Sequence, residues 1–164
     1  MTLRKPPTPH TYTRAHTNMS LDPLSTVASI AGICAVAGTL ISTLCSFIDN
    51  VQEAPKEVRM LNADLAAFYS TLTRIRLAVE APRVSGLPEG WLGDFDRLTA
   101  VCVETLNQIK IIVDKATVTE TTSTADQVWK TVKITFKFKR LEILRARLVS
   151  QVVVLDLSLE ELDE

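Results

Sequence analysis

The sequence predicts an all-α protein: a bundle of four to five helices behind a disordered N-terminal extension. Apolar residues recur at helical spacing along most of the chain, and glycine and proline are scarce beyond the first residues. With 164 residues, 46% of them hydrophobic and 23% charged, the chain suits one globular domain with its own core. We therefore divide it into a leader, residues 1–18, and a helical bundle, residues 19–164.

The leader is rich in proline and threonine, contains no acid, and has no hydrophobic period. This composition predicts disorder. The leader lacks the apolar stretch of a secretory signal, and its three early prolines disfavour the amphipathic helix of a mitochondrial leader. Because Met19 begins a segment that reads like a natural start, the leader can be interpreted either as a disordered extension or as an artefact of gene prediction.

The first predicted helix, residues 24–48, contains no charged residue. Asp22 and Pro23 precede it as an N-cap and a first-turn proline. It is long and apolar enough to span a bilayer, and it also fits a central helix that neighbours cover on all sides. We take the central helix as the resting state and membrane insertion as a second state that the same sequence allows.

Two faces of this helix differ in the size of their side chains. A bulky side consists of Val27, Ile30, Leu40, Leu44 and Phe47. Small side chains let another helix approach closely, in a core or in lipid. The small stripe, our candidate for helix packing or for membrane contact, consists of Ala31, Ala35, Gly38 and Ser42.

Three further helical regions follow. The second helix, residues 53–80, has an apolar seam with alternating spacings of three and four: Val58, Leu61, Leu65, Phe68, Leu72, Ile75 and Val79. The third is expected from about residue 92 to 116, with a buried side of Phe95, Leu98, Cys102, Leu106, Ile109 and Val113. A threonine-rich loop, 117–124, precedes a last region of one helix or two, broken near Lys139. Its apolar faces are Trp129, Val132 and Phe136, then Leu141, Leu144, Leu148, Val152 and Leu155.

The last region has an alternative interpretation as strands. Residues 133–138 alternate cations with apolar residues, and residues 152–155 are mostly β-branched. We favour the helix because the flanking residues keep the helical period and no turn residue interrupts them.

The same region carries a basic cluster in a chain whose net charge is −1. Four of its cations share a helical face and are our candidates for contact with an anionic surface: Lys133, Lys137, Arg140 and Arg147. A solvated face without a partner is the alternative. Nearby aromatic residues make nucleic acid conceivable, but the nearly neutral chain disfavours it as a partner.

Catalytic and metal-binding patterns are not found in the sequence. Both histidines, His10 and His16, lie in the leader, and no phosphate-loop, dinucleotide or hydrolase motif occurs. Asp94 and Asp96 are two residues apart and point different ways on a helix, so they fit its first turn better than an active site. We expect no enzyme activity, cofactor, metal or small-molecule substrate. The three cysteines form no CxxC pair, which indicates a reducing compartment and small buried side chains.

Two segments resemble a known family: MSLDPLSTVASIAGICAVAGTLISTLCSFI, from Met19, and DNVQEAPKEVRMLNADLAAF, from Asp49. The spacing of Ala54, Pro55, Glu57, Val58 and Leu61 contributes to the likeness. Together the segments resemble the N-terminal domain of fungal STAND (NOD-like receptor) proteins, which is described as HeLo-like. The family is also named for the N-terminal region of azaphilone pigment biosynthesis cluster protein L. The resemblance covers about residues 19–160.

The resemblance implies a helical bundle that acts without chemistry of its own. HeLo-type relatives execute cell death by inserting their first helix into a membrane, so we expect a cytoplasmic effector with inducible membrane association. Its partners would be a protein or a second copy, bound through helices, and an anionic membrane. The chain departs from the receptor pattern because it has no P-loop glycines, NACHT domain or repeats. The alternative is an accessory or regulatory protein of a fungal secondary-metabolite gene cluster, of the azaphilone pigment type.

Overall fold

The computed structural model describes residues 22–51, 54–81, 86–120 and 138–163. Within these ranges the protein consists of four α-helices and has no strand, which confirms the all-α bundle. The helices are α1 (Pro23–Asn50), α2 (Lys56–Glu80), α3 (Trp91–Glu120) and α5 (Phe138–Asp163). The leader and residues 121–137, where a fifth helix was expected to begin, lie outside the described ranges.

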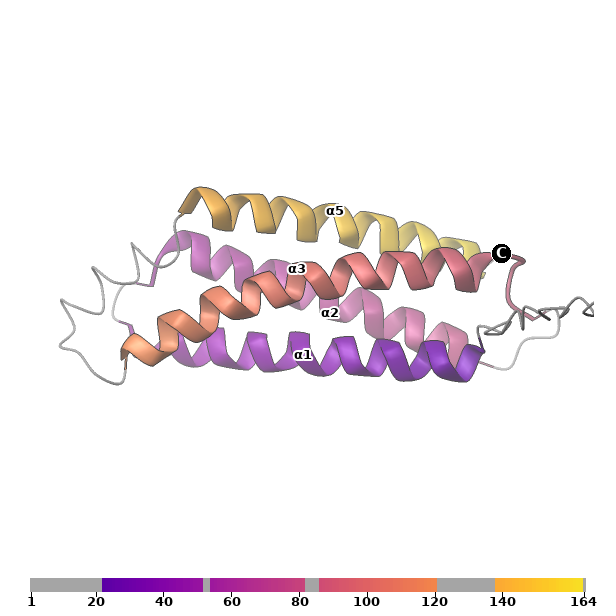
Figure 1. Cartoon of the computed structure of the whole chain (residues 1–164), viewed down its shortest axis with the longest axis horizontal. Coiled ribbons are helices and arrows are strands. Elements are labelled where there is room, and N and C mark those ends of the chain that lie inside the picture. Colours follow the sequence, from indigo (N-terminus) through magenta and orange to yellow (C-terminus); the bar gives the residue numbers. More distant parts are fainter. Residues whose placement is uncertain (1–21, 52–53, 82–85, 121–137, 164) are drawn as a thin grey trace, which may run out of the picture.

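The four helices form a bundle around a common core (Figure 1). α1 packs against α2 and α3, and α5 packs against the same two helices. The order around the bundle is therefore α1, α2, α5, α3, with α1 diagonally opposite α5. α1 and α3 run in one direction and α2 and α5 in the other (Figure 1). α2 therefore ends and α3 begins at the same end of the bundle, and before α3 Gly86 and Gly90 adopt φ values of 75° and 80°.

The seam predicted on α2 forms the centre of the core. All of its members, from Val58 to Val79, are buried, and none is more than 8% exposed. The predicted faces of α3 and α5 belong to the same core, in which Phe95, Leu106 and Leu148 are also buried. Burial of such a side chain stabilises a fold by about 1.5–3 kcal/mol relative to exposure. The 3.6-residue period therefore identified the core correctly.

Polar contacts join α5 to both of its neighbours. Arg145 Nε donates to Asp64 Oδ2 of α2 at 2.7 Å, and both side chains are less than one fifth exposed. At the other end of α5, Trp91 Nε1 of α3 donates to the Ser158 carbonyl at 3.1 Å. Because these bonds have defined geometry, they fix the register of α5 against α2 and α3.

One expectation about a helix end was wrong. α3 continues to Glu120, so the threonine-rich loop does not begin at Thr117. The Thr117 hydroxyl bonds the Val113 carbonyl at 3.2 Å, which lets a threonine remain within a helix. Residues 152–155 lie inside α5, so the strand alternative fails there. Leu148 and Leu155 are fully buried, and their helical packing outweighs the β propensity of the valines.

Candidate functional site: the outward face of α1

α1 begins where its capping residues predict. Asp22 lies in an extended conformation, and its carboxylate accepts a hydrogen bond of 3.2 Å from the Leu24 amide. Pro23 occupies the first turn, where its missing N–H is not needed. The helix then continues through Asn50 and is capped by the Val51 amide, which bonds the Phe47 carbonyl.

One side of α1 enters the core. Its buried residues are Thr26, Ile30, Ile33, Cys34, Ala37, Leu40, Leu44 and Phe47. These include four of the five bulky residues that the sequence grouped together, and the fifth, Val27, is half-buried. The expectation of a central helix covered on all sides was nevertheless wrong, because α1 occupies a corner of the bundle. Among the described helices, it makes extensive contact only with α2 and α3.

The other side of α1 faces outward and carries no charge from Leu24 to Ile48. Its exposed positions are Leu24, Ser25, Ala28, Ser29, Gly32, Ala35, Val36, Thr39, Ser42, Cys45 and Ser46. The Thr39 hydroxyl bonds the Ala35 carbonyl at 2.9 Å, and the Thr43 hydroxyl bonds the Thr39 carbonyl at 2.9 Å. These hydroxyls are satisfied within the helix, which lowers the cost of moving this face into an apolar environment.

The small stripe lies on this side, along the junction of α1 with α2. Ala35 and Ser42 are exposed, and Ala31 and Gly38 are half-buried. All four line a shallow groove of about 560 Å³. An added Cβ on Gly38 would lie 3.8 Å from Tyr69 Cε2, an ordinary contact distance. The resting bundle therefore has room for a methyl group at Gly38.

Two residues of α2 that the sequence did not single out border this groove. Tyr69 and Arg76 line it opposite the small stripe. They are seven residues apart, which is two helical turns, and so they lie on one face of α2. This spacing is the sequence feature that could have grouped them. On its other flank, α1 forms an apolar groove of about 360 Å³ with α3, lined by Gly32, Val36, Val103 and neighbouring residues.

The contacts that hold α1 differ in kind from those of α5. The uncharged segment from Leu24 to Ile48 has no group that can form an ion pair. Its Cys45 sulfur accepts a long hydrogen bond of 3.4 Å from Asn62 of α2, a weak interaction. α1 is thus attached mainly by apolar burial, whereas α5 also carries the Arg145–Asp64 ion pair.

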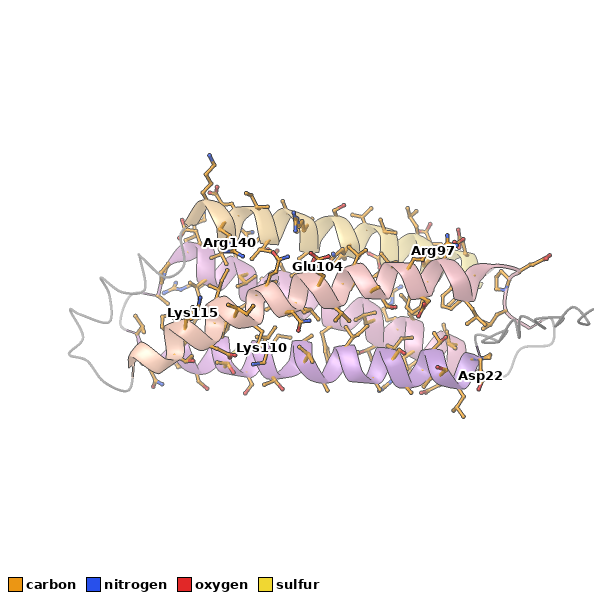
Figure 2. The ribbon with its side chains drawn as sticks, in the orientation of Figure 1. Asp22, Arg97, Glu104, Lys110, Lys115 and Arg140 are labelled. Atoms are coloured by element: carbon orange, nitrogen blue, oxygen red, sulfur yellow. The ribbon has the colours of Figure 1, made fainter. Side chains whose placement is uncertain are left out.

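The candidate anionic-surface residues are described only in part. Arg140 and Arg147 are exposed on α5, and Arg140 lies near the start of that helix (Figure 2). Lys133 and Lys137 lie outside the described residues. The structure therefore neither brings the four cations together nor separates them.

The cysteines behave as two classes. Cys34 and Cys102 are buried as expected, but Cys45 is exposed, so the expectation of burial was wrong for it. Burial raises the pKa of Cys34, and the hydrogen bond to Thr73 and the charge of Arg76 oppose this shift. Burial raises the pKa of Cys102 to about 12. Both buried thiols therefore stay protonated and poorly nucleophilic at neutral pH.

No chemical centre emerges from the described part of the chain. Within it, no three histidine, cysteine or carboxylate residues are grouped so as to hold a metal ion. Asp94 and Asp96 are exposed, and Asp94 pairs with Arg97 at 3.1 Å rather than with a second carboxylate. Asp94 therefore lies in the first turn of α3 as expected, whereas Asp96 follows that turn.

Among the described helices, α1 alone is long and apolar enough to cross a membrane. Only 33% of its most apolar window is buried in the bundle. Comparisons with protein-family models, with curated proteins and with solved structures gave no match to this chain. The family resemblance of residues 19–160 therefore stays a prediction.

Proposed function

We propose that this protein is a non-enzymatic helical effector of the fungal STAND N-terminal type, and that α1 acts by leaving the bundle and entering a membrane. The observation that carries the proposal is the absence of charge on the outward face of α1 from Leu24 to Ile48. The outer faces of α2, α3 and α5 all bear charged residues, among them Arg74, Glu104 and Arg140.

The dimensions of α1 support this role. Twenty-five residues, Leu24 to Ile48, extend for about 37 Å as a helix, which exceeds the hydrocarbon thickness of about 30 Å. Apolar side chains that leave the core are removed from water again by acyl chains, so lipid replaces much of the lost burial. No ion pair of this segment has to break.

The small stripe has a place in this mechanism. Ala31, Ala35, Gly38 and Ser42 line a shallow groove in the resting bundle, and Gly38 has room there for an added Cβ. In lipid, small residues at such spacing allow helices to approach closely. The stripe therefore serves assembly of inserted α1 helices, and the protein is cytoplasmic until an anionic membrane recruits it.

The first experiment measures dye release from liposomes of phosphatidylcholine and phosphatidylserine by the full-length protein. Ala35→Lys adds a charge to the outward face of α1, and Ala66→Lys makes the same change at an exposed alanine of α2. A lysine at the membrane centre costs about 2.5–3.5 kcal/mol, so Ala35→Lys should lower release by roughly 100-fold. Ala66→Lys should release dye like the parent, and both variants should keep the parent circular dichroism spectrum.

A second experiment tests whether α1 must leave the bundle. Thr73 of α2 acts on the Cys34 thiol of α1 through hydrogen bonding, so Thr73→Cys is the substitution chosen to link the two helices by a disulfide. The oxidised variant should release no dye, and the same sample should regain activity on reduction. Release by the oxidised form, or the absence of both release and liposome binding by the parent, would exclude this mechanism.

A further inference from the structure

α5 presents apolar side chains on two opposite faces. Its leucine seam enters the core, with Leu141, Leu148 and Leu155 fully buried. A second row is exposed on the opposite face of α5. This helix stands at the corner of the bundle diagonally opposite α1 (Figure 1). This outer stripe of α5 consists of Ile143, Ala146, Ser150, Val153 and Leu157.

The outer stripe has the geometry of a helix-pairing surface. Its spacings of three, four, three and four residues repeat the a/d pattern of a coiled-coil seam. Ile143, Val153 and Leu157 are 50%, 56% and 54% exposed, and Val149 and Val154 beside them are 48% and 43% exposed. Ala146 and Ser150 are small and exposed, so a second helix can approach closely at the centre. No described element covers this row.

The charges along the same line identify the occupant. Lys139 extends the stripe at its N-terminal end, and Glu161 extends it at its C-terminal end. Both are exposed. Two α5 helices in parallel would place lysine against lysine and glutamate against glutamate. An antiparallel pair places each lysine against a glutamate of the second copy, so the favourable orientation is the antiparallel one.

The spacing supports a twofold arrangement. Ser150 lies midway between Ile143 and Leu157, and also midway between Lys139 and Glu161. A twofold axis beside Ser150 therefore aligns the apolar pairs and the charged pairs at once. An isologous contact of this kind closes with two copies.

We infer that the protein forms an antiparallel homodimer through the outer stripe of α5. This contact does not involve α1, whose insertion is the proposed membrane step, because α5 stands diagonally opposite α1. It also leaves α1 free to move in each copy. A single helix pair is a small interface, so the dimer should dissociate on dilution.

Sedimentation velocity of the full-length protein, at concentrations from about 1 to about 200 µM, tests the inference. The experiment is done at low salt, because charge pairs are least screened there. The parent should shift from monomer to dimer across this range. Leu157→Lys should weaken the dimer at least tenfold. Leu77→Lys is the matched control, since Leu77 on α2 is 57% exposed, and it should dimerise like the parent.

A charge exchange tests the orientation. Lys139→Glu and Glu161→Lys should each weaken the dimer severalfold, and the double variant should recover the parent association. In a parallel dimer each single variant would only exchange one like-charge pair for another, so neither single variant would weaken the association. A parent that stays monomeric at the highest concentration overturns the inference. The inference is also overturned if Leu77→Lys weakens the dimer as much as Leu157→Lys does. It is likewise overturned if substitutions in the outer stripe reduce liposome binding and leave dimerisation unchanged.

Discussion

Arg145 of α5 and Asp64 of α2 form an interhelical ion pair, with Nε and Oδ2 2.7 Å apart. Their side chains are 17% and 18% exposed, whereas the Arg97 and Asp94 side chains of the pair within α3 are 83% and 80% exposed. The two pairs contain the same chemical groups in different solvent environments. They therefore allow a direct comparison of what burial adds to an ion pair.

Asp64→Ala should lower the free energy of unfolding by about 1–3 kcal/mol, because it leaves the Arg145 guanidinium largely buried and unpaired. Urea unfolding followed by circular dichroism measures the change. Asp94→Ala should leave the urea midpoint unchanged, since water screens that pair. Equal midpoints for the two variants would contradict the role assigned to Arg145 and Asp64.

The glycines offer a second comparison. Gly86→Ala should destabilise the protein by about 1–2 kcal/mol, because alanine is strained at a φ of 75°. Gly32→Ala should stabilise it by about 0.5–1 kcal/mol, because Gly32 is helical and an added Cβ meets no atom within 4 Å. Thermal unfolding should therefore shift in opposite directions for the two substitutions, and shifts of the same sign would contradict the geometry of the turn before α3.

Thiol reactivity should separate the three cysteines. A maleimide should label Cys45 quickly in the native protein and leave Cys34 and Cys102 unlabelled until urea unfolds the bundle. Peptide mapping of the labelled protein identifies the sites. Rapid labelling of Cys102 in the folded state would show that α3 opens locally from the core.

Cys102 also predicts how stability depends on pH. Its pKa is about 12 in the folded protein against 9.0 for the ordinary thiol, so above pH 9.0 the unfolded chain releases a proton that the folded chain retains. This contribution is fully present below pH 9.0 and is lost as the pH rises towards 12. Urea midpoints should fall more steeply with alkaline pH in the parent than in Cys102→Ala. Parallel curves would contradict the burial of this thiol.

Trp91→Phe should lower the free energy of unfolding by about 1–2 kcal/mol. In the parent, the Trp91 and Phe95 rings are stacked with centroids 4.7 Å apart. The substitution keeps an aromatic ring at position 91 and removes the donor to the Ser158 carbonyl. Tyr69→Phe removes a hydroxyl from a side chain that is 40% exposed, and it should leave stability unchanged. Denaturant titration of both variants makes the comparison, and it fails if the tyrosine substitution is the more costly.

The sequence by itself determined the helices and the core. The seam from Val58 to Val79 followed from the spacing of apolar residues, because the helical period sets which residues share a face. The cap at Asp22 followed from residue type, because an aspartate before a helix can accept a bond from a first-turn amide. The threonine run was misjudged, since a polar composition does not end a helix whose hydroxyls bond the preceding turn.

Tertiary structure alone decided which surfaces remained uncovered. An uncharged helix is equally compatible with the centre of a bundle and with a corner, and packing placed α1 at a corner with its small stripe facing outward. The two apolar faces of α5 could likewise be told apart only once α2 and α3 covered one of them. The physical reason is that exposure depends on which neighbours a helix receives, and contacts between residues distant in the chain set those neighbours.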